Sequence, residues 1–360
     1  MQLQSQPVPA ILRKNVAAIK GYSPGEQPQN SSYIKLNTNE NPYPPSPRVL
    51  AALRKSCNQS LRLYPEPLSD SLRSIAATTY GVRPENVLAG NGSDELLSIL
   101  ARCFVNHGDQ VVYPVPTYTL YDTLIGIQEG EKVTISYPSD FSLPEGLYSQ
   151  SGVMTILCNP NSPSGTLVPL EQIERLARCV SGVLVVDEAY IDFAEGDRKS
   201  ALPLIQRHSN LVVLRSFSKS FSLAGMRIGL AFGAEELISG MIKVKDSYNL
   251  SRLSLVSAIA ALQDLPWMMR NVGKIQKARN RLARLLVKMG FSVYPSQANF
   301  VMVRYRGEHL SGLYEELKKR RILVRYFDTR GLQDALRITV GGPKEIKTLL
   351  HEMGAILKVT

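Results

Sequence analysis

A short run near the middle of the chain places two cations among residues that otherwise favour burial. In "SFSKSFSLAGMRIG" (216–229), Lys219 follows a strand-like apolar segment and Arg227 stands eight residues later. A lysine in a partly apolar site has a depressed pKa and becomes a nucleophilic amine, suited to a Schiff base. Otherwise its ammonium group simply reaches the surface along its apolar stem. Arg227 can offer a planar fork to a phosphate, and the hydroxyls of Ser216 and Ser218 point the same way in an extended segment.

A lysine for an aldehyde, with hydroxyls and an arginine for a phosphate, describes the binding of pyridoxal phosphate. Asp187 closes the apolar run "VLVVD", where a carboxylate is costly unless it has a partner. At ~4 Å and an effective dielectric of ~20, it would attract a protonated pyridine nitrogen by about 4 kcal/mol, roughly three pKa units. That keeps the ring an electron sink. A helix cap or a structural ion pair is the alternative for Asp187. Tyr190 can hydrogen-bond the ring oxygen and Tyr118 can lie on the ring, although either tyrosine can instead be ordinary packing.

A glycine-rich run before a predicted helix gives a second candidate for phosphate binding. In "AGNGSDELL", the backbone N–H groups of Gly92, Ser93 and Asp94 lie at the helix start, where they can hold an anion. Asp94 and Glu95 are awkward beside an anion, so they must face away or cap the helix. A plain helix cap therefore remains open. The run is not a dinucleotide fingerprint, because GxGxxG needs a third glycine where Glu95 stands.

The elements that position these residues alternate between strands and helices. Strands that are apolar on both faces and separated by helices predict a mostly parallel sheet covered by helices. The predicted strands cover residues 86–90, 110–114, 132–136, 153–160, 182–189, 211–216 and 227–233, with helices at 94–107, 117–128 and 170–180. Polar or special-backbone residues stand at five consecutive strand ends. Because ligands of open α/β sheets bind at the carboxyl ends of strands, we expect one assembled site there.

The pattern also predicts a division into three parts. The first forty residues are rich in Pro, Gln, Ser and Asn, and indicate an arm rather than a core segment. We expect an N-terminal arm at 1–35, a large domain at 36–254, and a smaller α/β domain at 255–360 that packs with the arm. The smaller domain begins with a long basic helix.

Composition excludes several other classes of protein. The chain has 360 residues, 44% of them hydrophobic, with a net charge of +11. The cations near residues 270–290 fall opposite an apolar helical stripe, which indicates a solvated face rather than a nucleic-acid site. No apolar run approaches the ~20 residues of a membrane span. Four scattered cysteines without CxxC spacing indicate neither a disulfide scaffold nor a metal site, and the start shows no secretory pattern. We expect a cytoplasmic protein that binds no metal, nucleic acid or membrane.

Nine motifs together resemble one enzyme family. The chain resembles the fold-type I pyridoxal-phosphate-dependent aminotransferases, and within them the histidinol-phosphate aminotransferase subfamily. The matching motifs span about nine-tenths of the chain: "GYSPGEQP", "LNTNENPYPPSP", "RLYPEP", "GNGSDE", "PTY", "NPNSPSG", "DEAYIDF", "SFSKSFSLAGMRIG" and "LRITVG". This resemblance implies an α/β fold with a seven-stranded, mostly parallel sheet. It implies transamination of L-histidinol phosphate with 2-oxoglutarate, in histidine biosynthesis, by a homodimer.

The resemblance also implies a role for each motif residue. Lys219 would hold pyridoxal phosphate through a Schiff base and then move a proton between the substrate Cα and the cofactor. Asp187 would pair with the pyridine nitrogen and Tyr190 with the ring oxygen, while Tyr118 would stack on the ring. The cofactor phosphate would contact Gly92, Ser93, Asp94, Ser216, Ser218 and Arg227, and Tyr64 of the neighbouring subunit. The substrate's phosphate or carboxylate would contact Tyr22, Arg325 and Arg337.

One position departs from the family pattern. Relatives carry an asparagine directly before the proline of "NPTG", and it touches the ring oxygen. Here Ser162 stands in that place and Asn161 precedes it. Either Asn161 moves into the role or Ser162 makes a weaker contact.

Three alternative functions follow from the same residues. "SFSK" also fits the S-x-x-K motif of penicillin-recognising acyl enzymes, but the S-D-N and K-T-G motifs of that family do not occur. Within the fold, an aromatic-amino-acid aminotransferase and a phosphothreonine decarboxylase remain open. Arg337 would serve a carboxylate or a phosphate equally well.

Overall fold

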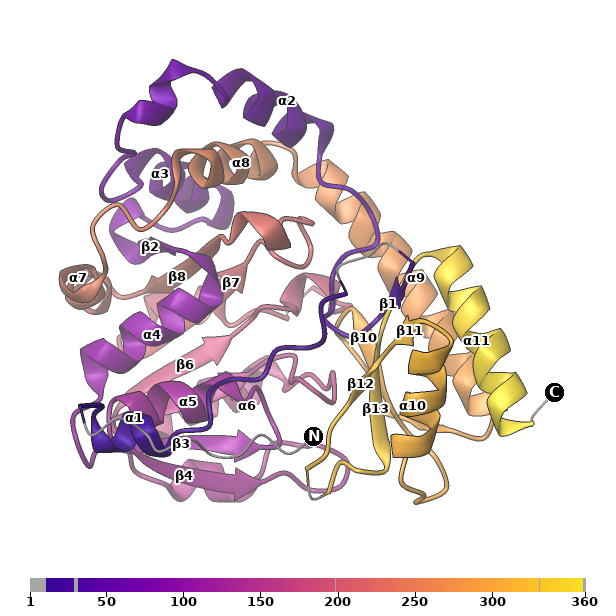
Figure 1. Cartoon of the computed structure of the whole chain (residues 1–360). Coiled ribbons are helices and arrows are strands. Elements are labelled where there is room, and N and C mark those ends of the chain that lie inside the picture. Colours follow the sequence, from indigo (N-terminus) through magenta and orange to yellow (C-terminus); the bar gives the residue numbers. More distant parts are fainter. Residues whose placement is uncertain (1–10, 29–31, 198, 330, 359–360) are drawn as a thin grey trace.

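Three sheets, with helices packed around them, make up the described part of the chain. The computed structural model describes residues 11–28, 32–197, 199–329 and 331–358. The large sheet has the strand order β2-β8-β7-β6-β5-β3-β4 (Figure 1). Its strands are β2 (Val87–Gly90), β3 (Gln110–Val115), β4 (Glu131–Ser136), β5 (Met154–Cys158), β6 (Val183–Asp187), β7 (Leu211–Ser216) and β8 (Gly229–Gly233). All seven coincide with strands predicted from the sequence.

Strand direction confirms a mostly parallel sheet. The pairs β3–β4, β3–β5, β5–β6 and β6–β7 are parallel. β8 runs antiparallel to both of its neighbours, β7 and β2. The carboxyl ends of β5, β6 and β7 therefore meet at one edge, where Cys158, Asp187 and Ser216 are the last residues.

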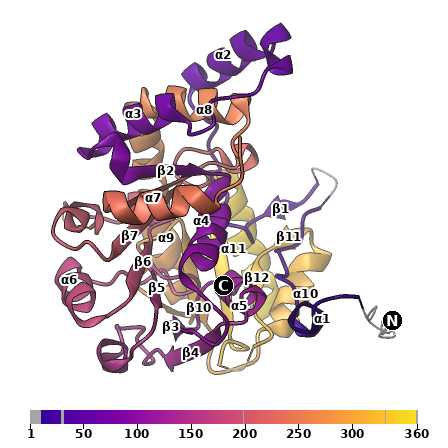
Figure 2. The ribbon, with the colours of Figure 1, turned by 90° about the vertical axis from the view of Figure 1, so that its left-hand side faces the viewer.

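Helices cover both faces of this sheet. The helices along the large sheet are α2 (Pro47–Ser56), α3 (Asp70–Tyr80), α4 (Gly92–Phe104), α5 (Leu120–Ile127), α6 (Leu170–Cys179), α7 (Glu235–Val244) and α8 (Arg252–Leu262). Side chains of α4, α5 and α7 share one buried cluster, and those of α2, α3, α6 and α8 share another. Figure 2 shows α6 on one side of the strands of the large sheet and α4 on the other.

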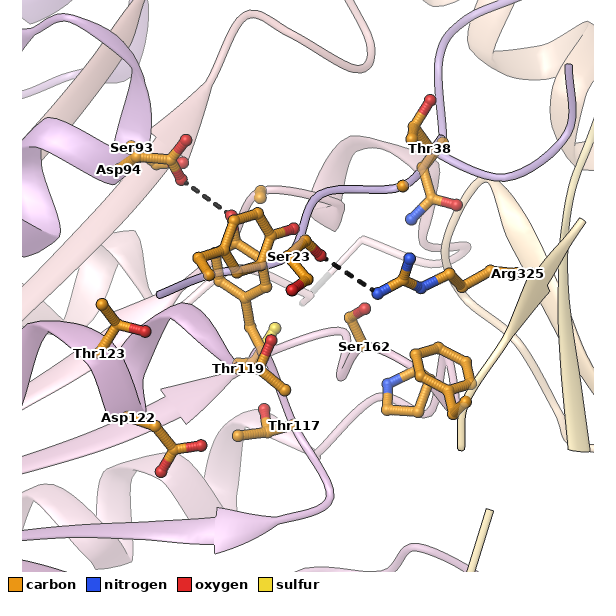
Figure 3. Close-up of a pocket in the computed structure, with 18 of the residues that line it drawn as sticks. Ser23, Thr38, Ser93, Asp94, Thr117, Thr119, Asp122, Thr123, Ser162 and Arg325 are labelled. Carbon is orange, nitrogen blue, oxygen red and sulfur yellow. Dashed lines mark hydrogen bonds between the residues drawn. The ribbon is translucent and has the colours of Figure 1, made fainter. Parts of the chain in front are cut away.

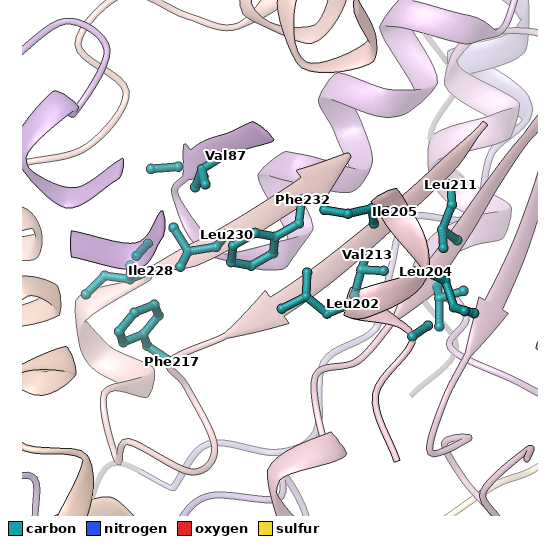
Figure 4. Packing of buried hydrophobic residues seen from close by; sticks show 14 of the residues in the cluster. Val87, Leu202, Leu204, Ile205, Leu211, Val213, Phe217, Ile228, Leu230 and Phe232 are labelled. Atoms are coloured by element: carbon teal, nitrogen blue, oxygen red, sulfur yellow. The ribbon is translucent and has the colours of Figure 1, made fainter. Parts of the chain in front are cut away.

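Alternation along each strand explains the two layers. In β7, Leu211 and Val213 belong to one cluster, whereas Val212 and Leu214 belong to the other. Successive side chains of a strand point to opposite faces, so a strand covered on both sides must be apolar throughout. Figure 4 shows part of one of these clusters, in which Leu211 and Val213 of β7 lie on the same side of the sheet as Leu230 and Phe232 of β8.

The C-terminal part forms its own sheet and cluster. The order β12-β13-β10-β9 is antiparallel, and α9, α10 and α11 pack against it. The bounds are α9 (Leu265–Lys288), β9 (Ser292–Val293), β10 (Phe300–Arg304), α10 (Ser311–Lys319), β11 (Ile322–Leu323), β12 (Arg325–Tyr326), β13 (Ala335–Thr339) and α11 (Pro343–Leu357). α8 contributes to the large-sheet cluster instead, and the boundary at residue 254 stays a prediction.

The N-terminal segment, which the sequence predicts to be an arm, contains two short elements, and the bounds of the arm stay a prediction. A short helix, α1 (Lys14–Ala18), precedes β1 (Ile34–Lys35), which pairs in parallel with β11. Leu36 is only 1% exposed and lies in the C-terminal cluster. Polar composition hid this role, because a two-residue strand and one leucine leave almost no periodic signal. Residues 1–10 and 29–31 lie outside the described part of the chain.

No helix in the described ranges combines the length and apolarity that a bilayer crossing requires.

Candidate active site

A large cavity opens where the strand ends, the small sheet and the N-terminal segment meet. Its volume is about 1380 Å³. Figure 3 shows part of its lining: Ser93 and Asp94 lie on one side, Arg325 on the other, and Thr117 and Ser162 between them. The residues that line it include most of the predicted set, namely Tyr22, Ser93, Asp94, Tyr118, Asp187, Tyr190, Ser216, Ser218, Lys219, Arg227, Arg325 and Arg337. The structure thus brings together residues spread over more than 300 positions.

Lys219 lies in the cavity wall after β7. Its Nζ donates a hydrogen bond to the carbonyl oxygen of Thr38, at 3.2 Å. Burial lowers the pKa of Lys219 to about 8, and the nearby positive charge of Arg337 acts in the same direction. The side-chain amide of Asn41 donates to the backbone carbonyls of Lys219 and Ser220, at 2.9 and 3.2 Å, and so fixes the loop. The lysine is therefore held in place and easily deprotonated.

Asp187 is a buried carboxylate with a donor on each oxygen. It is 3% exposed. The Tyr121 hydroxyl donates to Oδ2 at 2.9 Å, and the backbone N–H of Ala189 donates to Oδ1 at 3.2 Å. Burial raises its pKa to about 6, while these two hydrogen bonds oppose the rise. At neutral pH, Asp187 thus offers a negative charge from a buried position in the cavity wall.

Tyr190 turns its hydroxyl toward the N-terminal segment. That oxygen accepts a hydrogen bond from Asn39 Nδ2 at 3.0 Å. Burial raises the pKa of Tyr190 to about 12, against the opposing effect of Arg337. The phenol is therefore neutral and keeps a proton that it can donate to an oxygen in the cavity.

Arg227 lies over the start of α4 and forms the centre of an anion-binding corner. Its Nη1 donates to Ser218 Oγ at 3.2 Å and its Nη2 to Asp94 Oδ2 at 2.9 Å. Gly92 has φ +81°, and a Cβ there would stand 2.6 Å from Nη2 of Arg227. Only glycine therefore lets the guanidinium lie so close to the free N–H groups of the helix start.

The acidic pair of this helix has two different roles. Asp94 points into the cavity, where Oδ1 also accepts from Tyr118 at 3.2 Å. Glu95 instead accepts from the Asn249 side-chain amide at 2.7 Å and from the Asn91 N–H, so it caps the helix start. The plain capping interpretation thus fits Glu95, while the backbone before it stays open to the cavity.

The opposite side of the cavity carries two arginines, Arg325 and Arg337. Arg337 donates from Nη1 to Ser162 Oγ and from Nη2 to the Asn37 carbonyl, both at 2.9 Å. Its Nε is buried and has no hydrogen-bond partner among the described residues. Arg325 contacts the Ser23 carbonyl at 3.4 Å, the bond drawn in Figure 3. The guanidinium of Arg337 thus has donor capacity left for an anion.

The rings of Tyr22 and Tyr118 meet edge to face at the mouth of the cavity. Their centroids are 5.6 Å apart, at an interplanar angle of 72°. Tyr22 comes from the N-terminal segment and Tyr118 from the stretch before α5. The N-terminal segment therefore forms part of the cavity wall.

Three predicted residues lie outside this lining. Gly92 is buried beneath Arg227. Asn161 turns away, with Nδ2 donating to Ser164 Oγ at 2.9 Å and Oδ1 accepting from Thr117 at 2.9 Å. Of the two alternatives at the departing motif, Ser162 is therefore the residue in the cavity. Tyr64 is 78% exposed and stacks on Tyr248, beside a separate cavity of about 340 Å³.

Several site residues carry no signal that marked them in the sequence. Thr38, Asn39 and Asn41 belong to "LNTNENP", a stretch that follows no helical or strand period and matches no catalytic spacing. Tyr121 is a single tyrosine in an apolar helix pattern. The polar density of "LNTNEN" was the one available hint, because buried asparagines must find hydrogen-bond partners.

Comparisons with known proteins agree with this geometry. The family model described as aminotransferase class I and II matches residues 31–353. A histidinol-phosphate aminotransferase of Nostoc sp. is 44% identical over 96% of this chain and 98% of its own length. One from Geotalea daltonii is 43% identical over 93% of this chain and 96% of its own.

Solved structures show the same likeness. The histidinol-phosphate aminotransferase of Sinorhizobium meliloti, solved in complex with pyridoxal-5'-phosphate, superposes with a TM-score of 0.85 at 26% identity, over 90% of each chain. L-threonine-O-3-phosphate decarboxylase from Porphyromonas gingivalis reaches a TM-score of 0.80 at 23% identity, over 90% of this chain and 99% of that one. The second likeness concerns the fold alone.

Proposed function

The chain belongs to the class I and II aminotransferases and, within them, to the histidinol-phosphate aminotransferases, and from this premise we propose its reaction. It transfers the amino group of L-histidinol phosphate to 2-oxoglutarate, giving imidazole-acetol phosphate and glutamate, in histidine biosynthesis. The observation that carries the proposal is the joint placement of Lys219, Asp187 and Arg227 around one cavity. Each of them supplies a different group that pyridoxal phosphate needs.

The residues present fit pyridoxal phosphate. Asp187 is a buried carboxylate that lacks a cationic partner within hydrogen-bond distance among the described side chains, and a pyridinium nitrogen would supply one. The corner of Arg227, Ser218 and the start of α4 suits a phosphate, with Ser93 and Ser216 beside it. When bound, the cofactor supplies an aldehyde for amines and a ring that accepts an electron pair.

Lys219 holds and moves the proton in this site. With a pKa of about 8, its amine is neutral in a substantial fraction of molecules near neutral pH, so it can act as nucleophile and then as base. Nζ would take the proton from the substrate Cα and deliver it to the cofactor carbon that carried the aldehyde, and it would move a proton in the opposite direction when 2-oxoglutarate receives the amino group. Tyr190 would donate a hydrogen bond to the ring oxygen, and Tyr118 would lie against the ring. At the departing motif, the side chain of Asn161 is hydrogen-bonded to Thr117 and Ser164, so Ser162 is the residue that faces the cavity.

The far side of the cavity binds the substrate's anionic groups. Arg337, Arg325 and Tyr22 face the cavity opposite Arg227, and the free Nε of Arg337 adds a donor. A planar guanidinium binds carboxylate or phosphate bidentately. Two arginines and one phenol on this side fit a substrate that is an amine with a phosphate, and the same groups serve the carboxylates of 2-oxoglutarate and glutamate.

The active unit is a homodimer in the cytoplasm. Leu61, Leu63 and Tyr64 are exposed and line the smaller cavity together with Arg252. Exposed apolar side chains gathered in one place are typical of interfaces. In the dimer, Tyr64 of each subunit reaches the cofactor phosphate of the other. A Tyr64→Phe variant that forms dimers but binds pyridoxal phosphate no more weakly than the native protein would contradict this role.

Steady-state kinetics tests the substrate assignment. Purified protein loaded with pyridoxal phosphate is assayed with histidinol phosphate, phenylalanine and phosphothreonine side by side, with 2-oxoglutarate as acceptor. The proposal expects the highest kcat/KM for histidinol phosphate, because only it combines the amine and phosphate with an aromatic ring. A higher kcat/KM for phenylalanine would show that the enzyme is an aromatic-amino-acid aminotransferase instead. Release of CO₂ from phosphothreonine would show that it is a decarboxylase.

A further inference from the structure

Tyr121 makes a buried contact with the carboxylate at the centre of the site. It is 1% exposed, although it comes from α5, and its hydroxyl donates to Oδ2 of Asp187 at 2.9 Å. It is absent from the residues that line the cavity. Tyr121 has no role in the reaction proposed above.

In the part of the chain that the structure describes, the other groups near Asp187 do not donate a side-chain hydrogen bond to its carboxylate. From the turn that follows β6, the N–H of Ala189 donates to Oδ1. From β5, Cys158 stands opposite Asp187 in register, but its thiol donates to the carbonyl of Pro160 at 3.4 Å. The charges that act on Asp187 from further away are Lys219 and Asp94, with opposite signs. Among the described side chains, the Tyr121 hydroxyl is the one hydrogen-bonded to this carboxylate.

Tyr121 also touches the aromatic side of the site. Its ring meets Tyr118 edge to face, with centroids 5.6 Å apart and an angle of 86°. Tyr118 lines the cavity, three residues earlier in the chain. One side chain therefore contacts both the carboxylate under the ring site and the tyrosine expected to lie on the ring.

We propose that Tyr121 is a positioning residue that fixes the orientation of Asp187 and keeps it charged for the ring nitrogen of the cofactor. The inference rests on the proposed function, because it assigns Asp187 to that nitrogen. With one donor on each oxygen, the carboxylate cannot rotate without breaking a hydrogen bond in a site of low dielectric. A donor to the charged form also favours that form, which opposes the effect of burial.

The test replaces Tyr121 by phenylalanine and measures cofactor binding rather than turnover. Apoenzyme is titrated with pyridoxal phosphate from pH 5 to 8, and the absorption band of the bound cofactor gives the Kd. In Tyr121→Phe we expect a Kd at least about tenfold higher near neutral pH, as for loss of a hydrogen bond to a charged group. We also expect affinity to begin falling at a higher pH than in the native protein, because the pKa of Asp187 rises when it loses a donor.

Tyr113→Phe is the matched control. Tyr113 is a buried tyrosine whose ring meets Tyr121 at 6.1 Å, but its hydroxyl donates to Asp122 rather than to Asp187. Loss of this hydroxyl should leave both the Kd and its pH profile within twofold of the native values. An equal effect in both variants would show a general packing defect and overturn the proposal.

A double-mutant cycle keeps the inference falsifiable if Tyr121→Phe loses stability. In an Asp187→Asn background, Tyr121→Phe should change the Kd less than twofold, since the charge it supports has gone. If Tyr121→Phe raises the Kd in that background as much as it does in the native protein, the inference is overturned. If the native protein binds pyridoxal phosphate and Tyr121→Phe matches it at every pH, the inference fails while the proposed function stands. If the native protein shows no bound cofactor at all, both fail.

Discussion

The floor of the cavity and its mouth are built differently. The floor consists of residues at the carboxyl ends of neighbouring strands, such as Asp187 and Ser216, which are buried and hydrogen-bonded by adjacent segments. The mouth is made by Tyr22, which is 39% exposed, and by Arg325, whose contact with Ser23 is long at 3.4 Å. A sheet edge sets the floor, whereas two chain segments that meet only in space set the mouth.

This difference separates two kinds of contribution. Groups on the floor have their charge and orientation fixed before any ligand arrives, and preorganised polar groups lower barriers most. Groups at the mouth keep solvent contact and spare donor capacity, so they contribute mainly to affinity and selectivity. Arg337 lies between the two, since it is held by Ser162 and Asn37 and yet keeps a free Nε.

The largest effect should come from the floor. In Lys219→Ala, kcat for amino transfer from histidinol phosphate should fall by on the order of 10⁴-fold or more, because nucleophile and base are removed together. Borohydride reduction followed by peptide mapping should place the pyridoxyl label on residue 219 of the native protein. Lys219→Arg keeps the positive charge and should be equally inactive. A label on another lysine would show that Lys219 does not bind the cofactor, and the role given to the floor would be wrong.

The residue between floor and mouth should have the next largest effect. Arg337→Lys keeps a charge but loses the fork and its two hydrogen bonds, so kcat/KM should fall about 10- to 100-fold. The loss should lie mostly in KM. Arg325→Lys is the matched substitution at the mouth and should cost clearly less. Equal losses in the two variants would mean that the mouth is as preorganised as the floor.

The pH dependence of cofactor capture sharpens the account of the floor. The pKa of Lys219 is lowered to about 8, so the neutral fraction of its amine rises steeply up to that pH and by less than a further twofold above it. The rate at which apoenzyme captures pyridoxal phosphate should therefore rise about fivefold from pH 7 to pH 8, by about another twofold to pH 9, and then level off. Stopped-flow absorbance measures this rate. A rate that keeps climbing to pH 10 would show a lysine with its ordinary pKa.

The smallest effect is expected at the exposed edge. Tyr22→Phe removes one hydroxyl from a partly solvated ring and keeps its edge contact with Tyr118. KM for histidinol phosphate should rise about two- to fivefold with kcat nearly unchanged, in line with one ordinary hydrogen bond. Initial-rate kinetics measures both constants. A tenfold loss of kcat would instead show that Tyr22 contributes to the chemical step, as the floor residues do.

Prediction from the sequence was most successful for the floor. Each strand of the large sheet was visible because burial on both faces demands a continuous apolar run, and the residue that ends each run was then readable. The antiparallel direction of β8 was not visible, since an apolar run looks the same in either direction. The joining of Leu36 to the C-terminal core was missed, because its flanks are polar.

The sequence by itself determined which chemistry was present: an amine, a carboxylate and an anion-binding arginine, each placed next to a strand end by local pattern. Tertiary structure alone decided their partners. Lys219 contacts Thr38 across 181 positions, and Arg337 contacts Asn37 across 300. Tyr121 reaches Asp187 from α5, the helix that connects β3 to β4. Local pattern is fixed by backbone sterics and burial, whereas these contacts depend on how whole layers pack, which no short stretch of residues encodes.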